Sequence, residues 1–364
     1  MFGYVTRRVL EPPAFGLDIS DLTVKFVHLT RSGTGIHLGA FGEIEIPAGM
    51  VMGGEIHDEA ALARVLAAEL PRARPRRWFS RTRSCIASLP EEKSFVRVIE
   101  LPNIRPEDVA AAVRWEVEGV IPLPAGELYY DSTLTPRLAS SADHRDVLIT
   151  AFPRTIVQAY HRVLIGAGYM PLALELESQA ISRAVIPNLW LGDPSIIVDM
   201  GATRTSFIIF AGGSLIFTKS VAVGGRDFEM AIQSSLGVTA GEARRIKIEV
   251  GLNKNYREGR VFRALTPHLE TLSRELLDEL VFYREHPAKR HAALGDIARV
   301  ILCGGDANLF GLERYLATSI KKLTVLGDPF AKFSFLPGMV PPIPKSQALK
   351  YTTAIGLALR GAGL

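Results

Sequence analysis

The sequence contains few of the residues on which several specialised classes of protein depend. Only two of its 364 residues are cysteines, Cys85 and Cys303, and they are far apart, so neither a disulfide framework nor a zinc cluster is expected. The eight histidines show no spacing typical of a metal site or a catalytic triad. Lys and Arg (42) exceed Asp and Glu (38) by only four residues, which is too small an excess for a dedicated nucleic-acid-binding protein.

Long apolar runs are missing as well. The longest charge-free apolar stretches, 163–174 and 206–218, contain glycines and are much shorter than the ~20 residues of a membrane-spanning helix. At the N-terminus, Arg7 and Arg8 are followed by a Glu-Pro-Pro sequence at 11–13 instead of an apolar segment, which does not match a signal peptide. These features predict a protein of the reducing cytoplasm.

The residues that are present predict a two-domain α/β protein. Apolar residues make up 48% of the chain, and its length suffices for about two domains of ~150 residues. Extended runs at 15–19, 23–29 and 36–46 predict a β-meander, and a second meander of the same plan begins at Ser195. The repetition predicts two related halves, with a small α+β insertion at 85–150.

Apolar residues at helical spacing predict the helices between these strands. We expect helices at 58–71, 154–166, 178–186, 227–236, 241–250 and 346–360, together with a long amphipathic helix through 265–280.

Three segments share one local design, an apolar strand that ends in a polar or glycine turn: FGLDISDLTVK, IIVDMGATRTS and VILCGGDANLFGL. In α/β folds, ligands bind beyond the carboxyl ends of strands, where backbone N–H groups favour anions. Asp18 and Asp199 occupy matching places in the first two segments. A carboxylate beside a polyphosphate is favourable only with Mg²⁺ between them, so the pair predicts a Mg-nucleotide site. The alternative for each aspartate alone is a turn or cap residue.

The order of these turns resembles the actin-like ATPase superfamily, with its two phosphate loops and its adenosine loop. Within that superfamily, the chain resembles the PilM family of type IV pilus assembly proteins from about residue 14 to residue 360. The resemblance is carried, in family order, by GLDISDLTVKFVHL, ASLPEEKSFVRVIELP, VRWEVEGVIPLP, LELESQAISRAV, IIVDMGATRTSFIIF, AVGGRDF, ILCGGDANLFGLERYLA and TAIGLAL. RVIELP and VRWEVEGVIPLP are the most specific, because actin relatives in general lack them.

The resemblance implies a duplicated actin-like (ribonuclease H-like) α/β fold, with two domains around a nucleotide cleft and an inserted α+β subdomain 1C. The implied bounds are 1–84, 151–190 and 346–364 for subdomain 1A, 85–150 for subdomain 1C, 191–226 and 298–345 for subdomain 2A, and 227–297 for subdomain 2B.

The resemblance also implies a function. A protein of this kind is a cytoplasmic scaffold of the inner-membrane pilus assembly platform, which binds ATP with Mg²⁺ and docks the N-terminal cytoplasmic peptide of the membrane protein PilN beside subdomain 1C. Other platform and motor proteins are further implied partners, whereas ATP hydrolysis and self-association stay open. Two alternatives are a small-molecule kinase of the actin superfamily, for which the chain lacks a polar insertion suited to a sugar, and a membrane-associated cell-division-type actin homologue, for which it lacks a C-terminal amphipathic helix.

By position, the resemblance places Mg²⁺ at Asp18 and Asp199. It implies a water-orienting carboxylate at Glu177, for which a helix cap is the alternative. Lys25, Glu242 and Lys247 have the alternative of facing water. The residues implied for nucleotide binding are Asp18, Ser20, Lys25, Asp199, Gly201, Ala202, Thr203, Thr205, Gly224, Gly225, Glu242, Lys247, Gly304, Gly305 and Asp306, of which Gly304 and Gly305 let the backbone approach the nucleoside.

Asp21, Asp306 and Phe310 depart from the family pattern. Asp21 stands where the first phosphate loop commonly has a small residue, and a carboxylate about 5 Å from a phosphate charge costs roughly 1 to 3 kcal/mol. We therefore expect Asp21 to turn outward or to be masked by Mg²⁺. Phe310 is expected to fill the core or to pack on the base. Six arginines at 72–83 predict a solvated linker or, alternatively, contact with anionic lipid.

Overall fold

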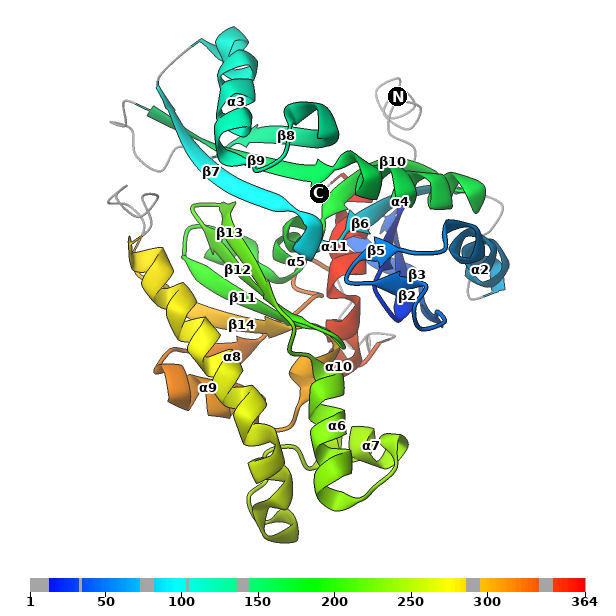
Figure 1. The fold of residues 1–364 in the computed structure, drawn as a ribbon, viewed down its shortest axis with the longest axis vertical. Helices are drawn as coiled ribbons and strands as arrows, with labels where there is room; N and C mark the ends of the chain where they lie inside the picture. Colours follow the sequence, from blue (N-terminus) through cyan, green and yellow to red (C-terminus); the bar gives the residue numbers. More distant parts are fainter. Residues whose placement is uncertain are drawn as a thin grey trace.

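The structure is a computed structural model that describes residues 13–32, 35–72, 82–102, 105–135, 144–285, 295–333 and 343–363. Most of the arginine run, at 73–81, lies outside the described residues. Two five-stranded sheets form the centres of two lobes, and a smaller three-stranded unit lies above them (Figure 1). We call the lobes lobe I and lobe II, in chain order.

The sheet of lobe I has the strand order β10-β6-β1-β2-β3. Its first three strands form an antiparallel meander, and β6 and β10 continue the sheet in parallel from β1. β1 is buried along its whole length, as expected of a central strand that is covered on both faces. The bounds are β1 (Phe15–Ile19), β2 (Thr23–Ser32), β3 (Gly35–Glu45), β6 (Ser84–Leu89) and β10 (Met170–Leu176).

The sheet of lobe II has the order β13-β12-β11-β14-β15. It repeats the plan of lobe I, because β11, β12 and β13 form an antiparallel meander and β14 and β15 extend it in parallel from β11. The predicted duplication is therefore confirmed. The bounds are β11 (Ser195–Met200), β12 (Thr205–Ala211), β13 (Ser214–Val221), β14 (Arg299–Cys303) and β15 (Thr324–Leu326).

The small unit consists of a sheet with the order β7-β9-β8 and one helix. Its strands are β7 (Phe95–Pro102), β8 (Leu128–Leu134) and β9 (His144–Pro153), and α3 (Pro106–Val120) packs on them around a core of its own. β6 pairs with β1 and not with this sheet. We therefore propose to draw this unit, which we call the insert, from Phe95 to Pro153 rather than from residue 85 to residue 150.

The helices join and cover the sheets. α5 (Glu177–Val185) and α11 (Thr352–Gly361) pack against each other between the lobes (Figure 1). The expected C-terminal helix is divided into α10 (Lys345–Ala348), a 3-10 turn and α11. Among helices of the described residues, none combines the length and hydropathy that crossing a bilayer requires. The others are α2 (Glu59–Arg72), α4 (Arg154–Gly166), α6 (Gly225–Leu236), α7 (Ala240–Glu249), α8 (Arg260–Glu285) and α9 (Leu312–Ile320).

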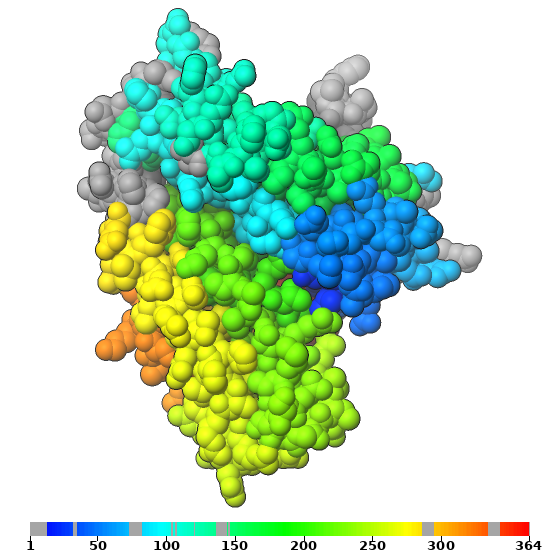
Figure 2. All heavy atoms as spheres, in the orientation of Figure 1, coloured from blue at the N-terminus to red at the C-terminus, as the bar shows by residue number. Residues whose placement is uncertain are grey.

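A short 3-10 helix, η1 (Glu91–Lys93), occupies the junction of the three units. It follows β6 of lobe I, precedes β7 of the insert, and contacts β13 of lobe II. In the space-filling view, the cyan segment that contains η1 fills the seam between the blue surface of lobe I and the green surface of lobe II (Figure 2). η1 therefore contacts or adjoins all three units.

Glycines set the close approach of α11 to its neighbours. A Cβ atom added at Gly356 would overlap the carbonyl group of Ala180 in α5, and one at Gly16 of β1 would overlap the carbonyl oxygen of Ala354 in α11. Backbone thus packs on backbone where the two helices lie between the lobes.

We expect Gly356→Ala to lower the free energy of unfolding by about 1–3 kcal/mol, because an overpacked methyl group forces the helices apart. Gly241→Ala is the matched control. It lies in α7 with no atom within 4 Å of the added Cβ, so the better helix propensity of alanine should raise stability by about 0.5–1 kcal/mol. Denaturant midpoints measure both changes, and a Gly356→Ala protein as stable as wild type would contradict the packing.

Candidate functional site

A cavity of about 520 Å³ lies between the two lobes. The β1–β2 turn, the β11–β12 turn and the glycine turn after β14 all open onto it. Asp18 and Asp199, from mirrored strands, therefore face one shared cleft. The predicted residues that line it are Asp18, Ser20, Lys25, Glu177, Asp199, Gly201, Ala202, Thr203, Gly225, Lys247, Gly304, Gly305 and Asp306.

Asp18 is held from two sides. Its Oδ1 accepts a hydrogen bond from the Ser88 hydroxyl of β6 at 3.0 Å, and Lys25 Nζ lies 3.9 Å from Oδ2. Lys25 is opposite Asp18 in the register of β1 and β2 and also donates to Thr23 Oγ1 at 2.7 Å. Its side chain is only 13% exposed, so Lys25 faces the cleft and not the solvent.

Ser20 takes part in the same turn but bonds locally. Its hydroxyl donates to the Thr23 carbonyl oxygen at 2.9 Å and lies 3.1 Å from Thr23 Oγ1. The side chain of Ser20 thus closes the β1–β2 turn, which fixes the direction in which Asp18 and Asp21 leave the backbone.

Three carboxyl groups on the floor of the cavity repel one another. Burial, with the nearby charge of Asp18, raises the pKa of Asp199 to about 6. Burial, with the charges of Asp18 and Glu91, raises the pKa of Glu177 well above its usual range. Such a set of oxygen donors is the type that Mg²⁺ prefers, and a cation would relieve the repulsion. The chemistry of these donors therefore fits a magnesium ion that keeps part of its water shell.

Glu177 does not cap its own helix. The N-terminus of α5 is instead capped by Glu91, whose Oε2 accepts a hydrogen bond from the Ser178 N–H at 3.0 Å. Glu177 Oε2 lies 3.5 Å from the Glu91 N–H and its side chain lines the cavity. The helix-cap alternative is therefore wrong, and the side chain of Glu177 lies at the cavity between the lobes.

Lys247 is not exposed on its helix. Its Nζ lies 2.5 Å from Asp306 Oδ1 and 2.6 Å from Glu229 Oε1, and its side chain is 6% exposed. Burial raises the pKa of Asp306, which the charge of Lys247 opposes. These ion pairs tie α6 and α7 to the glycine turn after β14, so they build one wall of the cavity.

Thr205, Gly224 and Glu242 lie outside the lining of the cavity, contrary to expectation. The Thr205 hydroxyl is buried and donates to the Val223 carbonyl oxygen at 2.7 Å. A Cβ at Gly224 would lie 2.6 Å from the Ala202 carbonyl oxygen, so this glycine serves turn packing. Glu242 is exposed and accepts from the Thr239 N–H at 3.1 Å in the capping box of α7, which lowers its pKa.

The two glycines of the turn after β14 both line the cavity and differ in what an added side chain would meet. Gly304 has φ +85, and a Cβ there would lie 2.6 Å from Asp199 Oδ1 and close to the Met200 backbone. Packing against β11 therefore requires Gly304, whereas a Cβ at Gly305 would be 3.4 Å from Lys350 Cβ, which is nearly ordinary contact. Phe310 neither fills the core nor lines the cavity, because it is 55% exposed.

Sequence reasoning missed Ser88, Glu91 and above all Arg204. Arg204 stands in the β11–β12 turn and forms an ion pair with Asp21 of the β1–β2 turn, with 3.2 Å between Arg204 Nη2 and Asp21 Oδ1. Asp21 therefore neither turns outward nor needs Mg²⁺ to be masked. The sequence did contain a signal for this ion pair, because Asp21 and Arg204 stand in the two mirrored turns and carry opposite charges.

Comparisons with known proteins agree on one family. The sequence model of the family described as "Type IV pilus assembly protein PilM" matches residues 16–362. Among solved structures, the chain is similar to a PilM-PilN type IV pilus biogenesis complex, with a TM-score of 0.78 and 25% identity over 96% of this chain and 99% of that one.

Two further structures share the fold at lower identity. The ethanolamine utilization protein EutJ from Carboxydothermus hydrogenoformans gives a TM-score of 0.53 at 16% identity, over 95% of this chain and 89% of that one. MreB5 of Spiroplasma citri bound to ADP gives 0.53 at 14% identity, over 95% and 94%. These likenesses confirm the expected actin-like fold.

The raised pKa of Asp199 predicts a linkage between pH and magnesium. Its folded-state pKa, about 6, exceeds the ordinary value of 3.8, so the folded protein holds this proton more tightly and Asp199 lowers stability as pH rises through that range. We expect Mg²⁺ to raise the melting temperature clearly at about pH 7.5 and little at about pH 5, where the carboxyl group is protonated.

The variant Asp199→Asn should lose the contribution of Asp199 to the pH dependence of stability, while the raised pKa of Glu177 keeps its own contribution, and it should lose most of the response to Mg²⁺. Melting curves across the pH series measure these effects. A Mg²⁺ response that is equal at both pH values in the wild type, or unchanged in the variant, would contradict the assignment.

Proposed function

Because the chain belongs to the family of the type IV pilus assembly protein PilM, we propose that it is a cytoplasmic scaffold that binds Mg-ATP between its lobes and docks a short peptide of a PilN-type membrane protein. The observation that carries the proposal is the convergence of Asp18 and Asp199 on one cavity. The related complex that contains PilN supports the choice of partner, and the ADP-bound MreB5 supports the choice of ligand.

In this proposal, Asp18 and Asp199 hold Mg²⁺ directly or through its water molecules. When bound, the ion neutralises phosphate charge and the repulsion between the carboxylates. The Gly201 N–H already donates to the Arg204 carbonyl oxygen at 2.9 Å, so phosphate oxygens would be bound by the rest of the turn, including the Thr203 hydroxyl. The Gly304–Gly305 turn, with the wall fixed by Lys247, would receive the nucleoside.

Glu177 is proposed to orient the attacking water. Its carboxyl group lines the cavity, and in the absence of a cation burial and the charges of Asp18 and Glu91 raise its pKa, which opposes its action as a base. We therefore propose at most slow ATP hydrolysis, in keeping with a protein whose task is assembly and not turnover.

The partner peptide is proposed to dock at the foot of the insert. A second cavity, also of about 520 Å³, lies between β7, η1 and β13. It offers an apolar wall from Phe95, Ile121 and Pro122 and charged groups from Arg97 and Lys219, a combination suited to a short extended peptide with apolar anchors. A scaffold that binds the cytoplasmic end of a membrane protein here would work at the inner face of that membrane.

The nucleotide half of the proposal is tested with Asp199→Asn. Loss of one of the two central carboxylates should weaken Mg-ATP binding at least tenfold, about 1.4 kcal/mol, in isothermal titration calorimetry. The matched control is Glu242→Gln, an acidic residue of lobe II that lies outside the cavity and whose glutamine keeps the capping box. Equal affinities of wild type and Asp199→Asn would reject the site.

The partner half is tested with a synthetic peptide of the N-terminal cytoplasmic segment of the PilN-type protein. Arg97→Met should weaken peptide binding several-fold, because Arg97 lines the second cavity. Arg114→Met, an exposed arginine on α3 of the same insert, should have no effect. Fluorescence anisotropy measures both, with and without Mg-ATP, and equal losses in the two variants would move the docking site elsewhere.

A further inference from the structure

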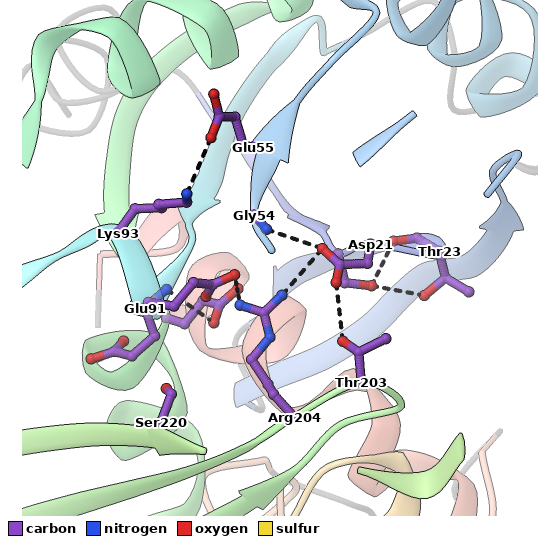
Figure 3. Close-up of polar contacts among 12 residues, drawn as sticks. Asp21, Thr23, Gly54, Glu55, Glu91, Lys93, Thr203, Arg204 and Ser220 are labelled. Carbon is purple, nitrogen blue, oxygen red and sulfur yellow. Dashed lines mark hydrogen bonds and ion pairs between the residues drawn. The ribbon is translucent and has the colours of Figure 1, made fainter. Parts of the chain in front are cut away.

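An ionic clasp joins the two mirrored turns across the cleft (Figure 3). Asp21 belongs to the β1–β2 turn of lobe I. Its Oδ2 accepts a hydrogen bond from the Thr203 hydroxyl at 3.1 Å, and its Oδ1 accepts one from Arg204 Nη2 at 3.2 Å. Both donors come from the β11–β12 turn of lobe II. The clasp therefore spans the cleft beside Asp18 and Asp199.

Lobe I holds the Asp21 carboxylate in place on its other side. The N–H of Gly54 donates to Asp21 Oδ1 at 3.0 Å, and the Gly54 carbonyl oxygen accepts a hydrogen bond from the buried Tyr160 hydroxyl at 3.0 Å. A Cβ at Gly54 would overlap Pro90, immediately before η1. Several elements of lobe I thus fix the position of the Asp21 side chain.

Arg204 also reaches a third element. Its other terminal nitrogen, Nη1, forms an ion pair with Glu92 of η1, and its side chain is only 18% exposed. Burial lowers the pKa of Arg204, and the charge of Asp21 opposes this. One guanidinium group therefore connects the turn of lobe II with the turn of lobe I and with η1.

The donors of this clasp are of the kind that binds phosphate. A hydroxyl and a guanidinium group at a turn that follows a strand form charge-assisted hydrogen bonds to phosphate oxygens as readily as to a carboxylate. In the structure, both of them bind Asp21. The carboxylate therefore takes an anion position that both turns share.

We propose that Asp21 is an internal anion that competes with a nucleotide phosphate for Thr203 and Arg204, and that its displacement releases Arg204 from Glu92 and frees η1. The inference deepens the proposed nucleotide function and rests on it. Two anions cannot occupy the one position between Arg204 Nη2 and the Thr203 hydroxyl without strong repulsion. A phosphate that enters must therefore move Asp21 aside.

The clasp also gives the two cavities a physical connection. Glu91 and Glu92 of η1 line the second cavity together with Phe95 and Arg97, and β7 of the insert begins directly after η1. Release of Glu92 from Arg204 would change the charge and the mobility of that wall. Occupancy of the phosphate position is in this way transmitted to the foot of the insert.

The decisive variant is Asp21→Asn, which keeps the size of the side chain and removes its charge. We expect its dissociation constant for Mg-ATP to fall at least tenfold relative to wild type, because the competing anion is gone. The matched control is Asp193→Asn, which loses an ion pair with Arg299 (2.8 Å) in lobe II and lies outside the cavity lining; its affinity should equal that of wild type. Mg-ADP and inorganic pyrophosphate are titrated in parallel to show which phosphate competes.

A second measurement needs no nucleotide. Backbone hydrogen exchange in η1 should be faster in both Asp21→Asn and Glu92→Gln than in wild type, because each change removes one side of the clasp. Glu92→Gln should also keep the Mg-ATP affinity of wild type within about threefold, under 1 kcal/mol by the usual conversion, while the partner peptide loses its dependence on Mg-ATP.

The results distinguish a failure of the proposed competition from a failure of the proposed nucleotide function. If Asp21→Asn binds Mg-ATP more weakly than the wild type, or equally well, the proposed competition is wrong. Binding of Mg-ATP by the wild type would in that case still support the proposed function. If neither protein binds Mg-ATP, the proposed function fails. In that case unchanged exchange in η1 overturns the clasp as well, and faster exchange supports it as a lobe-closing contact.

Discussion

Repulsion between buried carboxyl groups is the constraint on which the rest of the structure depends. Because the two sheets share one strand order, the carboxyl ends of β1 and β11 meet at the same cleft, and each strand brings an aspartate to it. Ser88 and Lys25 hold the carboxylate of Asp18, and Lys25 and the Cys303 thiol also act to lower the pKa of Asp199. Burial, with the charge of Asp18, nevertheless raises the pKa of Asp199, and a divalent cation would offset the repulsion between the two carboxylates.

The protein neutralises the rest of the cleft from within. Lys247 joins Glu229 and Asp306 inside lobe II, and Arg204 joins Asp21 and Glu92 across the lobes. The first group fixes a wall of the cavity, since all its members belong to one lobe. The second group joins side chains of different units, so under our proposal the link between the lobes depends on which anion Arg204 binds.

Burial explains why these charges have consequences. An exposed ion pair contributes little and exchanges freely with water, whereas a guanidinium that is mostly withdrawn from solvent must keep an anionic partner. Arg204 is in that position. It cannot simply lose Asp21 and Glu92, but it can leave them when a phosphate takes their place. Such an exchange is the simplest physical means of coupling a ligand to the geometry of the insert.

The strand–turn pattern was sufficient to predict the fold and the place of the cleft. Alternating and buried apolar runs determine strands locally, and the mirrored aspartates follow from the repeat. Thr205 and Glu242, which the family resemblance implied, and Phe310 do not line the cavity, because the sequence does not show which side chains a strand, a helix or a loop points inward. The sequence pattern also placed the start of the insert at residue 85. The structure pairs β6 with β1 instead, and this pairing joins residues that are 70 positions apart, as in the hydrogen bond between Ser88 and Asp18.

The sequence by itself determined the duplicated α/β plan, the family and the two acidic strand ends, because these depend on local patterns of polarity and on the order of short motifs. Only the tertiary structure decided which charges neutralise one another. Arg204 and Asp21 are 183 positions apart, and Lys247 and Asp306 are 59 apart. Ion pairing depends on distance in space between side chains of different elements, and no local pattern contains that distance.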